Sequence, residues 1–287
     1  MTLPTLPTPA QFLTLRVRAD HEHAEMVTLC AGYERGSWRQ DDFVKYLFGF
    51  LLEFAFRWSA LRQLNSATAS RMIEEAARRL YDSERFDRRG EFGELLLHAA
   101  LRNHFGTEPA VAKIFYKSND NDTVKGFDCV HVSEGDDGEL ALWLGEAKFY
   151  ADAVEGIAAA LKSLGGLLET ERLKRELTII RGHSDPDWPL TPAFQALTAG
   201  RSLDDVFPIL RIPVLVTYDS AAVASNTGVT DEYLDQLTAE VAPLFERFAS
   251  DERLPQDAAI HLILIPLREK RVFAAALHDQ LIRYQAR

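Results

Sequence analysis

The sequence is poor in cysteine and carries no long uncharged apolar run. Only two of its 287 residues are cysteines, Cys30 and Cys129, which excludes a zinc site built from cysteines and fits a reducing cytoplasm. The longest apolar region, residues 43–58, is interrupted by three charged residues, so it does not predict a membrane span. The N-terminal MTLPTLPTPAQF lacks the basic start and apolar core of a signal peptide. These absences predict a cytoplasmic protein.

Positive charge is also scarce. The formal net charge is −11, with 43 acidic residues against 32 Lys and Arg. The most arginine-rich stretch, residues 71–89, holds six arginines and five acids, a mixture typical of an ion-paired helix surface. Proteins that hold nucleic acid unaided usually present a basic stripe. The composition therefore predicts weak intrinsic affinity for nucleic acid, unless a bound metal supplies local positive charge.

The sequence contains neither a Walker loop nor a Ser-His-Asp arrangement, so it predicts no ATP site or serine nucleophile of its own. With 47% hydrophobic and 26% charged residues, it reads as an ordinary globular protein. Its length is enough for a full core in one large or two modest domains.

The most informative segment is GFDCVHV-SEGDDG-ELALWLGEAKF. Residues 126–133 and 139–146 both read as strands, and Gly135-Asp136-Asp137-Gly138 between them is typical of a hairpin turn. Asp128 lies seven residues before the turn and Glu146 eight residues after it, so an antiparallel ladder brings the two side by side. Glu146 and Lys148 are two residues apart and leave the same face of the strand.

Two carboxylates and a lysine gathered in this way are a common site for a divalent metal that cuts nucleic acid. Asp128, Glu146 and the backbone carbonyl of Ala147 offer the hard oxygen ligands that suit Mg²⁺ or Mn²⁺. Lys148 can hold an attacking water or neutralise charge on phosphorus oxygens. The alternative is a solvated salt bridge at a strand end, because Asp, Glu and Lys are mostly exposed in proteins.

The elements around this hairpin suggest a fold class. From residue 91 the pattern predicts a helix (90–106), a strand (111–117), the hairpin, a long helix (151–175), and then strands at 213–218 and 259–266 that alternate with helices at 231–249 and 269–285. Residues 39–64 and 67–86 predict helices, and 182–208 predicts a long loop or an irregular insertion. This order indicates an α/β fold with a mixed sheet flanked by helices, the layout of the restriction-endonuclease-like core, after a helical N-terminal region.

One further acid lies in the helix that precedes the hairpin. Glu94 sits off the apolar stripe of this helix. In the restriction-endonuclease-like layout the helix runs beside the hairpin, so Glu94 can serve as a metal ligand or as a base near the metal. The alternative is a solvent-facing acid that the helix dipole favours.

Three other side chains have simpler structural interpretations. His131, Cys129 and Trp143 are predicted to be core residues. His21 and His23 make only a weak metal pattern, and the segment Asn119–Asp122 is predicted to be a surface loop.

The segments RRGEFGELLLHAALR, KSNDNDTVKGFDCVHV and ELALWLGEAKFY resemble the HamA effectors of the Hachiman anti-phage defence system, most clearly over residues 88–160. The resemblance implies a PD-(D/E)XK nuclease that works with a large helicase, HamB, and is held silent until that partner engages DNA. It implies that Glu94 is the helix acid, Asp128 and Glu146 the metal ligands and Lys148 the catalytic lysine, with Phe127-Asp128 in place of Pro-Asp.

We therefore expect a Mg²⁺-dependent deoxyribonuclease in a hetero-complex, with a mainly helical region at 1–88 as a candidate for partner binding and a nuclease-like domain at 89–287. Two alternatives remain: a catalytically idle subunit that regulates its helicase, and a stand-alone DNA-repair nuclease.

Overall fold

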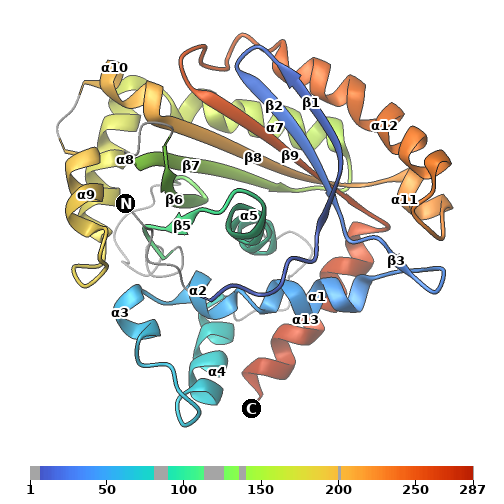
Figure 1. The fold of residues 1–287 in the computed structure, drawn as a ribbon, viewed down its shortest axis with the longest axis horizontal. Coiled ribbons are helices and arrows are strands. Elements are labelled where there is room, and N and C mark those ends of the chain that lie inside the picture. Colours follow the sequence, from blue (N-terminus) through green and yellow to red (C-terminus); the bar gives the residue numbers. More distant parts are fainter. Residues whose placement is uncertain (1–6, 81–89, 113–125, 136–139, 200–201, 287) are drawn as a thin grey trace.

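The computed structural model describes residues 7–80, 90–112, 126–135, 140–199 and 202–286. Its centre is a seven-stranded sheet with the strand order β1-β2-β9-β8-β7-β6-β5 (Figure 1). The strands of this sheet are β1 (Thr14–His21), β2 (Ala24–Cys30), β5 (Glu108–Pro109), β6 (Cys129–Glu134), β7 (Leu140–Phe149), β8 (Leu210–Asp219) and β9 (Ala259–Leu267). The four central strands, β2, β9, β8 and β7, are parallel, whereas β1, β6 and β5 join antiparallel at the edges. The predicted mixed sheet is confirmed.

Helices cover both faces of the sheet. They are α1 (Gln40–Phe48), α2 (Leu51–Ala55), α3 (Trp58–Leu61), α4 (Ala69–Leu80), α5 (Glu91–His104), α7 (Ala153–Leu167), α8 (Thr170–His183), α9 (Thr191–Leu197), α10 (Leu203–Val206), α11 (Ala221–Ser225), α12 (Asp231–Ala249) and α13 (Lys270–Gln285). α7 contacts β7 and β8, and α12 contacts α7, β1 and β2. α5 lies against β6, β7 and β8 and is itself contacted by α1 and α2. In Figure 1, α5 lies between the sheet and the layer that holds α1, α2 and α13.

The position of α5 explains a difference from the sequence. Its apolar stripe predicts one buried face, yet every residue from Phe92 to Arg102 is buried, including Glu94 and His98. A helix that is buried all round lies inside a core. The sheet covers one side of α5 and the N-terminal helices cover the other, so its polar side chains need partners within the protein.

The N-terminal third is not wholly helical. β1 and β2 form an antiparallel hairpin, and β2 pairs with β9 at the far end of the chain. A further short hairpin follows, made of β3 (Tyr33–Glu34) and β4 (Ser37–Trp38). The sequence did not reveal β1 because this edge strand is largely exposed and has little apolar alternation. The division near residue 88 stays a prediction, although two strands from before it extend the sheet.

Several predicted boundaries need correction. The long helix predicted at 151–175 is two helices, because α7 ends at Leu167 and α8 begins at Thr170. The predicted helix at 39–64 is divided among α1, α2 and α3, and the predicted loop at 182–208 contains α9, α10 and a 3₁₀ turn at Phe207–Ile209.

Other expectations hold. α12 has the predicted bounds, and β8 and β9 each contain their predicted strand. Within the predicted strand 111–117, residues 111–112 are not in a strand and 113–117 lie outside the described residues, as do the Asn119–Asp122 segment and residues 136–138 of the turn. In the part of the chain that the structure describes, no helix has both the length and the apolar character to cross a membrane.

Candidate metal-dependent nuclease site

The hairpin of β6 and β7 brings Asp128 and Glu146 together. Cys129 pairs with Gly145, so Asp128, which directly precedes β6, lies beside the part of β7 that carries Glu146. The backbone N–H of Asp128 donates to the carbonyl of Gly145 at 2.7 Å. The side chain of Asp128 accepts a hydrogen bond from the backbone N–H of Ala147 through Oδ2 at 2.9 Å. This bond fixes the carboxylate against the strand that carries Glu146.

Lys148 completes the group on the same strand. Its Nζ donates to Oε1 of Glu146 and, at 3.0 Å, to Oγ of Ser163 in α7. Glu146 is only 5% exposed, and the side chain of Lys148 is 17% exposed. The solvated salt bridge considered from the sequence is therefore wrong, because this pair lies beneath α7.

The electrostatics of Glu146 suit a cation. Burial and the nearby charge of Asp128 raise the pKa of Glu146, while Lys148 and hydrogen bonds from Lys148 and Ser163 oppose the rise. Two neighbouring carboxylates repel one another unless positive charge is shared between them, and the burial of Glu146 strengthens that repulsion. A divalent ion would supply that charge, so the chemistry of these donors fits Mg²⁺.

The number of protein ligands also limits the kind of metal. Among the described residues, no three His, Cys, Asp or Glu side chains converge closely enough to hold an ion by themselves. Mg²⁺ commonly uses one or two carboxylates and keeps several waters. Asp128, Glu146 and the carbonyl of Ala147 would hold such an ion.

Glu94 comes from the opposite layer. A Cβ on Gly93 would lie 3.2 Å from Cβ of Phe149 and 3.6 Å from Cβ of Ala147, so the first turn of α5 packs beside the end of β7. Alternation along β7 places Glu146 and Lys148 on the other face, beneath α7. Glu94 is 8% exposed, so the solvent-facing interpretation is wrong. Its role as a metal ligand stays a prediction.

Ser163 is a site residue that the sequence did not reveal. A serine in an Ala- and Leu-rich helix carries no recognisable motif. One signal was present, because Ser163 lies three residues after Ala160 and next to Leu164, both buried. Helical spacing therefore puts it at the edge of the buried stripe of α7. Only the packing of α7 on β7 shows which strand residue it contacts.

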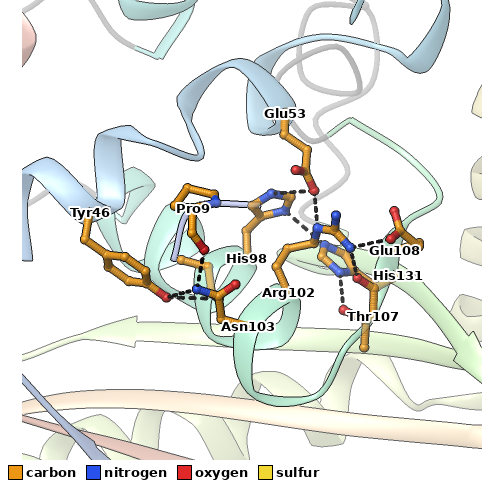
Figure 2. Close-up of polar contacts among 10 residues, drawn as sticks. Pro9, Tyr46, Glu53, His98, Arg102, Asn103, Thr107, Glu108 and His131 are labelled. Carbon is orange, nitrogen blue, oxygen red and sulfur yellow. Dashed lines mark hydrogen bonds and ion pairs between the residues drawn. The ribbon is translucent and has the colours of Figure 1, made fainter. Parts of the chain in front are cut away.

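A second polar cluster, also missed, lies on the α5 side of the sheet (Figure 2). His98 Nδ1 lies 3.0 Å from His131 Nε2, and His131 Nδ1 lies 2.7 Å from Oγ1 of Thr107. Burial, with the charges of His98 and Arg102, holds the pKa of His131 well below its usual range. His131 is thus a neutral core histidine, as predicted, and Cys129 and Trp143 are buried as well.

Arg102 joins this cluster to the N-terminal helices. Its guanidinium contacts Glu53 of α2, donates to the carbonyl of Thr107, and lies 2.7 Å from Oε1 of Glu108. Glu53 Oε1 is also 3.5 Å from Nε2 of His98. Figure 2 shows these side chains converging between α2, α5 and the strand edge. The cluster therefore ties α2 to the edge of the sheet that carries Asp128.

The predicted ion pairing of the arginine-rich segment is confirmed where it is described. In α4, Arg78 pairs with Glu74 at 2.7 Å, and Arg79 and Arg71 both pair with Glu75. Residues 81–89 lie outside the described part. The described arginines are thus balanced by acids on the same helix.

The mixed sheet with its flanking helices is consistent with the restriction-endonuclease-like fold class. The family model HamA matches residues 10–281, nearly the whole chain, and the chain therefore belongs to the HamA family. No curated protein matches the sequence. Membership of this family fits an effector of the Hachiman anti-phage defence system.

Proposed function

We propose that this HamA protein is a metal-dependent DNA endonuclease that acts as the effector of a defence complex. The observation that carries the proposal is the meeting of Asp128, Glu146 and Lys148 at one end of the β6–β7 hairpin, where Glu146 is buried and Lys148 contacts α7. Family membership supports the defence context. The proposed reaction is hydrolysis of a phosphodiester, in which a water oxygen bonds to phosphorus and the bond from phosphorus to a sugar oxygen breaks.

Each residue has a distinct proposed task. Asp128 and Glu146, with the carbonyl of Ala147, would hold Mg²⁺ or Mn²⁺, and Glu94 of α5 is a candidate base near the ion. The bound ion would polarise the phosphodiester and lower the pKa of a coordinated water. The ammonium of Lys148 would hold the attacking water or offset the charge that builds on the phosphorus oxygens.

We propose that a helicase partner of the HamB type controls access to DNA. The chain has a net charge of −11, and the described arginines of α4 are paired with acids of that helix. Strong unaided DNA binding needs a basic surface. A partner that presents the DNA would remove this need, and the N-terminal helices are a candidate contact region.

Plasmid nicking by the complex of this chain with its helicase tests the proposal. We expect nicking in Mg²⁺, none after addition of EDTA, and a loss of at least about 100-fold in Glu146→Ala and Lys148→Ala, the scale of removing a key electrostatic group. Lys174→Ala is a matched control, because the Lys174 side chain is 53% exposed on α8 and pairs with Glu171 of the same helix at 3.4 Å.

Three outcomes would contradict the proposal. Nicking that survives Glu146→Ala or Lys148→Ala would show that another site cuts the DNA. Full anti-phage protection by the same variants would instead favour the catalytically idle regulatory subunit. Activity of this chain without any helicase would favour a stand-alone repair nuclease.

A further inference from the structure

Ser163 of α7 lies within hydrogen-bonding distance of the proposed catalytic lysine. The Oγ atom of Ser163 is 3.0 Å from Nζ of Lys148, and Ser163 is also one of the groups that lower the pKa of Glu146. A serine hydroxyl can accept from an ammonium and donate to a carboxylate at the same time. Ser163 therefore contacts the proposed catalytic lysine and lies beside the proposed metal ligand Glu146.

The position of Ser163 is fixed by the packing of α7. Asp152 caps the start of this helix by accepting from the backbone N–H of Glu155 at 2.8 Å. Gly156 lets the helix approach β8 closely, because a Cβ there would lie 2.6 Å from Cγ1 of Val216. Ser163 lies two turns further along this anchored helix. Its hydroxyl is thus held by the scaffold and does not depend on a mobile loop.

Lys148 needs Ser163 as a second partner because Glu146 contacts the Lys148 ammonium and would also bind the metal ion. In the structure, the Lys148 ammonium contacts both Glu146 and Ser163. Once Glu146 carries a cation, its charge is shared and it attracts the ammonium less. The hydroxyl of Ser163 is then a neutral acceptor that keeps the largely buried ammonium directed toward the site.

We propose that Ser163 is a positioning residue that holds the Lys148 ammonium in place when Glu146 is engaged with the metal. This inference rests on the proposed nuclease function. It predicts that Ser163 affects the chemical step through Lys148 and leaves DNA binding and metal binding almost unchanged.

The test compares Ser163→Thr with Ser163→Val in the complex with the helicase, under the conditions in which the parent complex nicks plasmid DNA. The two variants have nearly the same shape and differ in the hydroxyl. We expect Ser163→Thr to keep kcat within about threefold of the parent and Ser163→Val to lose about 10- to 100-fold, the range for a hydrogen bond to a charged group. KM for DNA should stay within about twofold of the parent in both variants, because neither change alters contacts that the enzyme makes equally with bound DNA and with the transition state.

A second readout does not depend on cleavage. The rise in melting temperature that Mg²⁺ produces should be the same in Ser163→Val, Ser163→Thr and the parent, since the carboxylates remain. Equal kcat values for the two variants would overturn the inference, as would loss of the Mg²⁺ effect in Ser163→Val alone. In either case, the proposed nuclease function would still hold if the parent complex nicks DNA and the Glu146→Ala complex does not. An inactive parent complex would refute both.

Discussion

Arg102 provides the sharpest test of how the buried cluster stabilises the fold. Its side chain is 3% exposed and lies between the carboxylates of Glu53 and Glu108, which are 8% and 2% exposed at their side chains. Arg102→Met keeps most of the apolar stem and removes the guanidinium. The change leaves two buried carboxylates without this cation and leaves the carbonyl of Thr107 without this donor.

The size of the effect follows from what remains around each acid. Breaking a buried ion pair by removing one partner typically costs about 3–5 kcal/mol. His98 Nε2 remains 3.5 Å from Glu53, so this acid keeps one polar neighbour. We therefore expect a loss of about 3–4 kcal/mol, within a total stability that is typically about 5–15 kcal/mol. For a chain of this size, that loss lowers Tm by roughly 10 °C.

Urea unfolding followed by tryptophan fluorescence measures the loss. Arg71→Met is the control, because Arg71 is 73% exposed and lies 3.9 Å from Glu75 on the surface of α4. It should cost no more than about 0.5 kcal/mol. The double variant Arg102→Met, Glu108→Gln should be more stable than Arg102→Met alone, because it removes one of the two buried carboxylates that lost the Arg102 guanidinium. A loss below about 1 kcal/mol in Arg102→Met would refute the reasoning.

Three further predictions concern pH, packing and metal. The folded chain holds the pKa of His131 well below its usual range, so only the unfolded chain protonates this histidine near pH 6.5. The free energy of unfolding should therefore fall as the pH drops below about 6.5. The urea midpoint of His131→Gln should fall less steeply over the same pH range than that of the parent. Gly145→Ala should lower Tm, because the added Cβ would lie 2.5 Å from Sγ of Cys129 and crowd the core. In Gly182→Ala the added Cβ meets no atom within 4 Å, so this change within a helix should raise Tm slightly. Equal Tm shifts in the two variants would contradict this reasoning. Mg²⁺ should raise the Tm of the parent, EDTA should reverse the rise, and Asp128→Asn should weaken it; an undiminished rise in that variant would remove Asp128 from the ligands.

Local patterns were enough to predict the C-terminal elements and the hairpin. The helix at 231–249 has its predicted bounds because its apolar positions repeat with the helical period and Thr230 caps its start. The pairing of Asp128 with Glu146 followed from their nearly equal distances to one turn. Both signals depend on residues that are close in sequence, so they can be recognised without knowledge of the tertiary packing.

Features that join distant segments were not readable in this way. β2 pairs with β9, which lies more than 200 residues away in the sequence, and β1, which has little apolar alternation, pairs with β2. The burial of Glu94 and His98 arises because α1 and α2 cover the outer side of α5. No period within α5 itself contains that information.

The sequence by itself determined the mixed α/β class, the hairpin, and the convergence of two acids and a lysine, because each depends on short-range periodicity or on turn distance. Only the tertiary structure decided that Glu146 and Lys148 lie under α7, that Ser163 contacts Lys148, and that Glu94 is buried in α5 on the other side of the sheet. The physical reason is that side-chain environments across layers depend on which helices pack on each face of the sheet, and packing is settled by the whole chain.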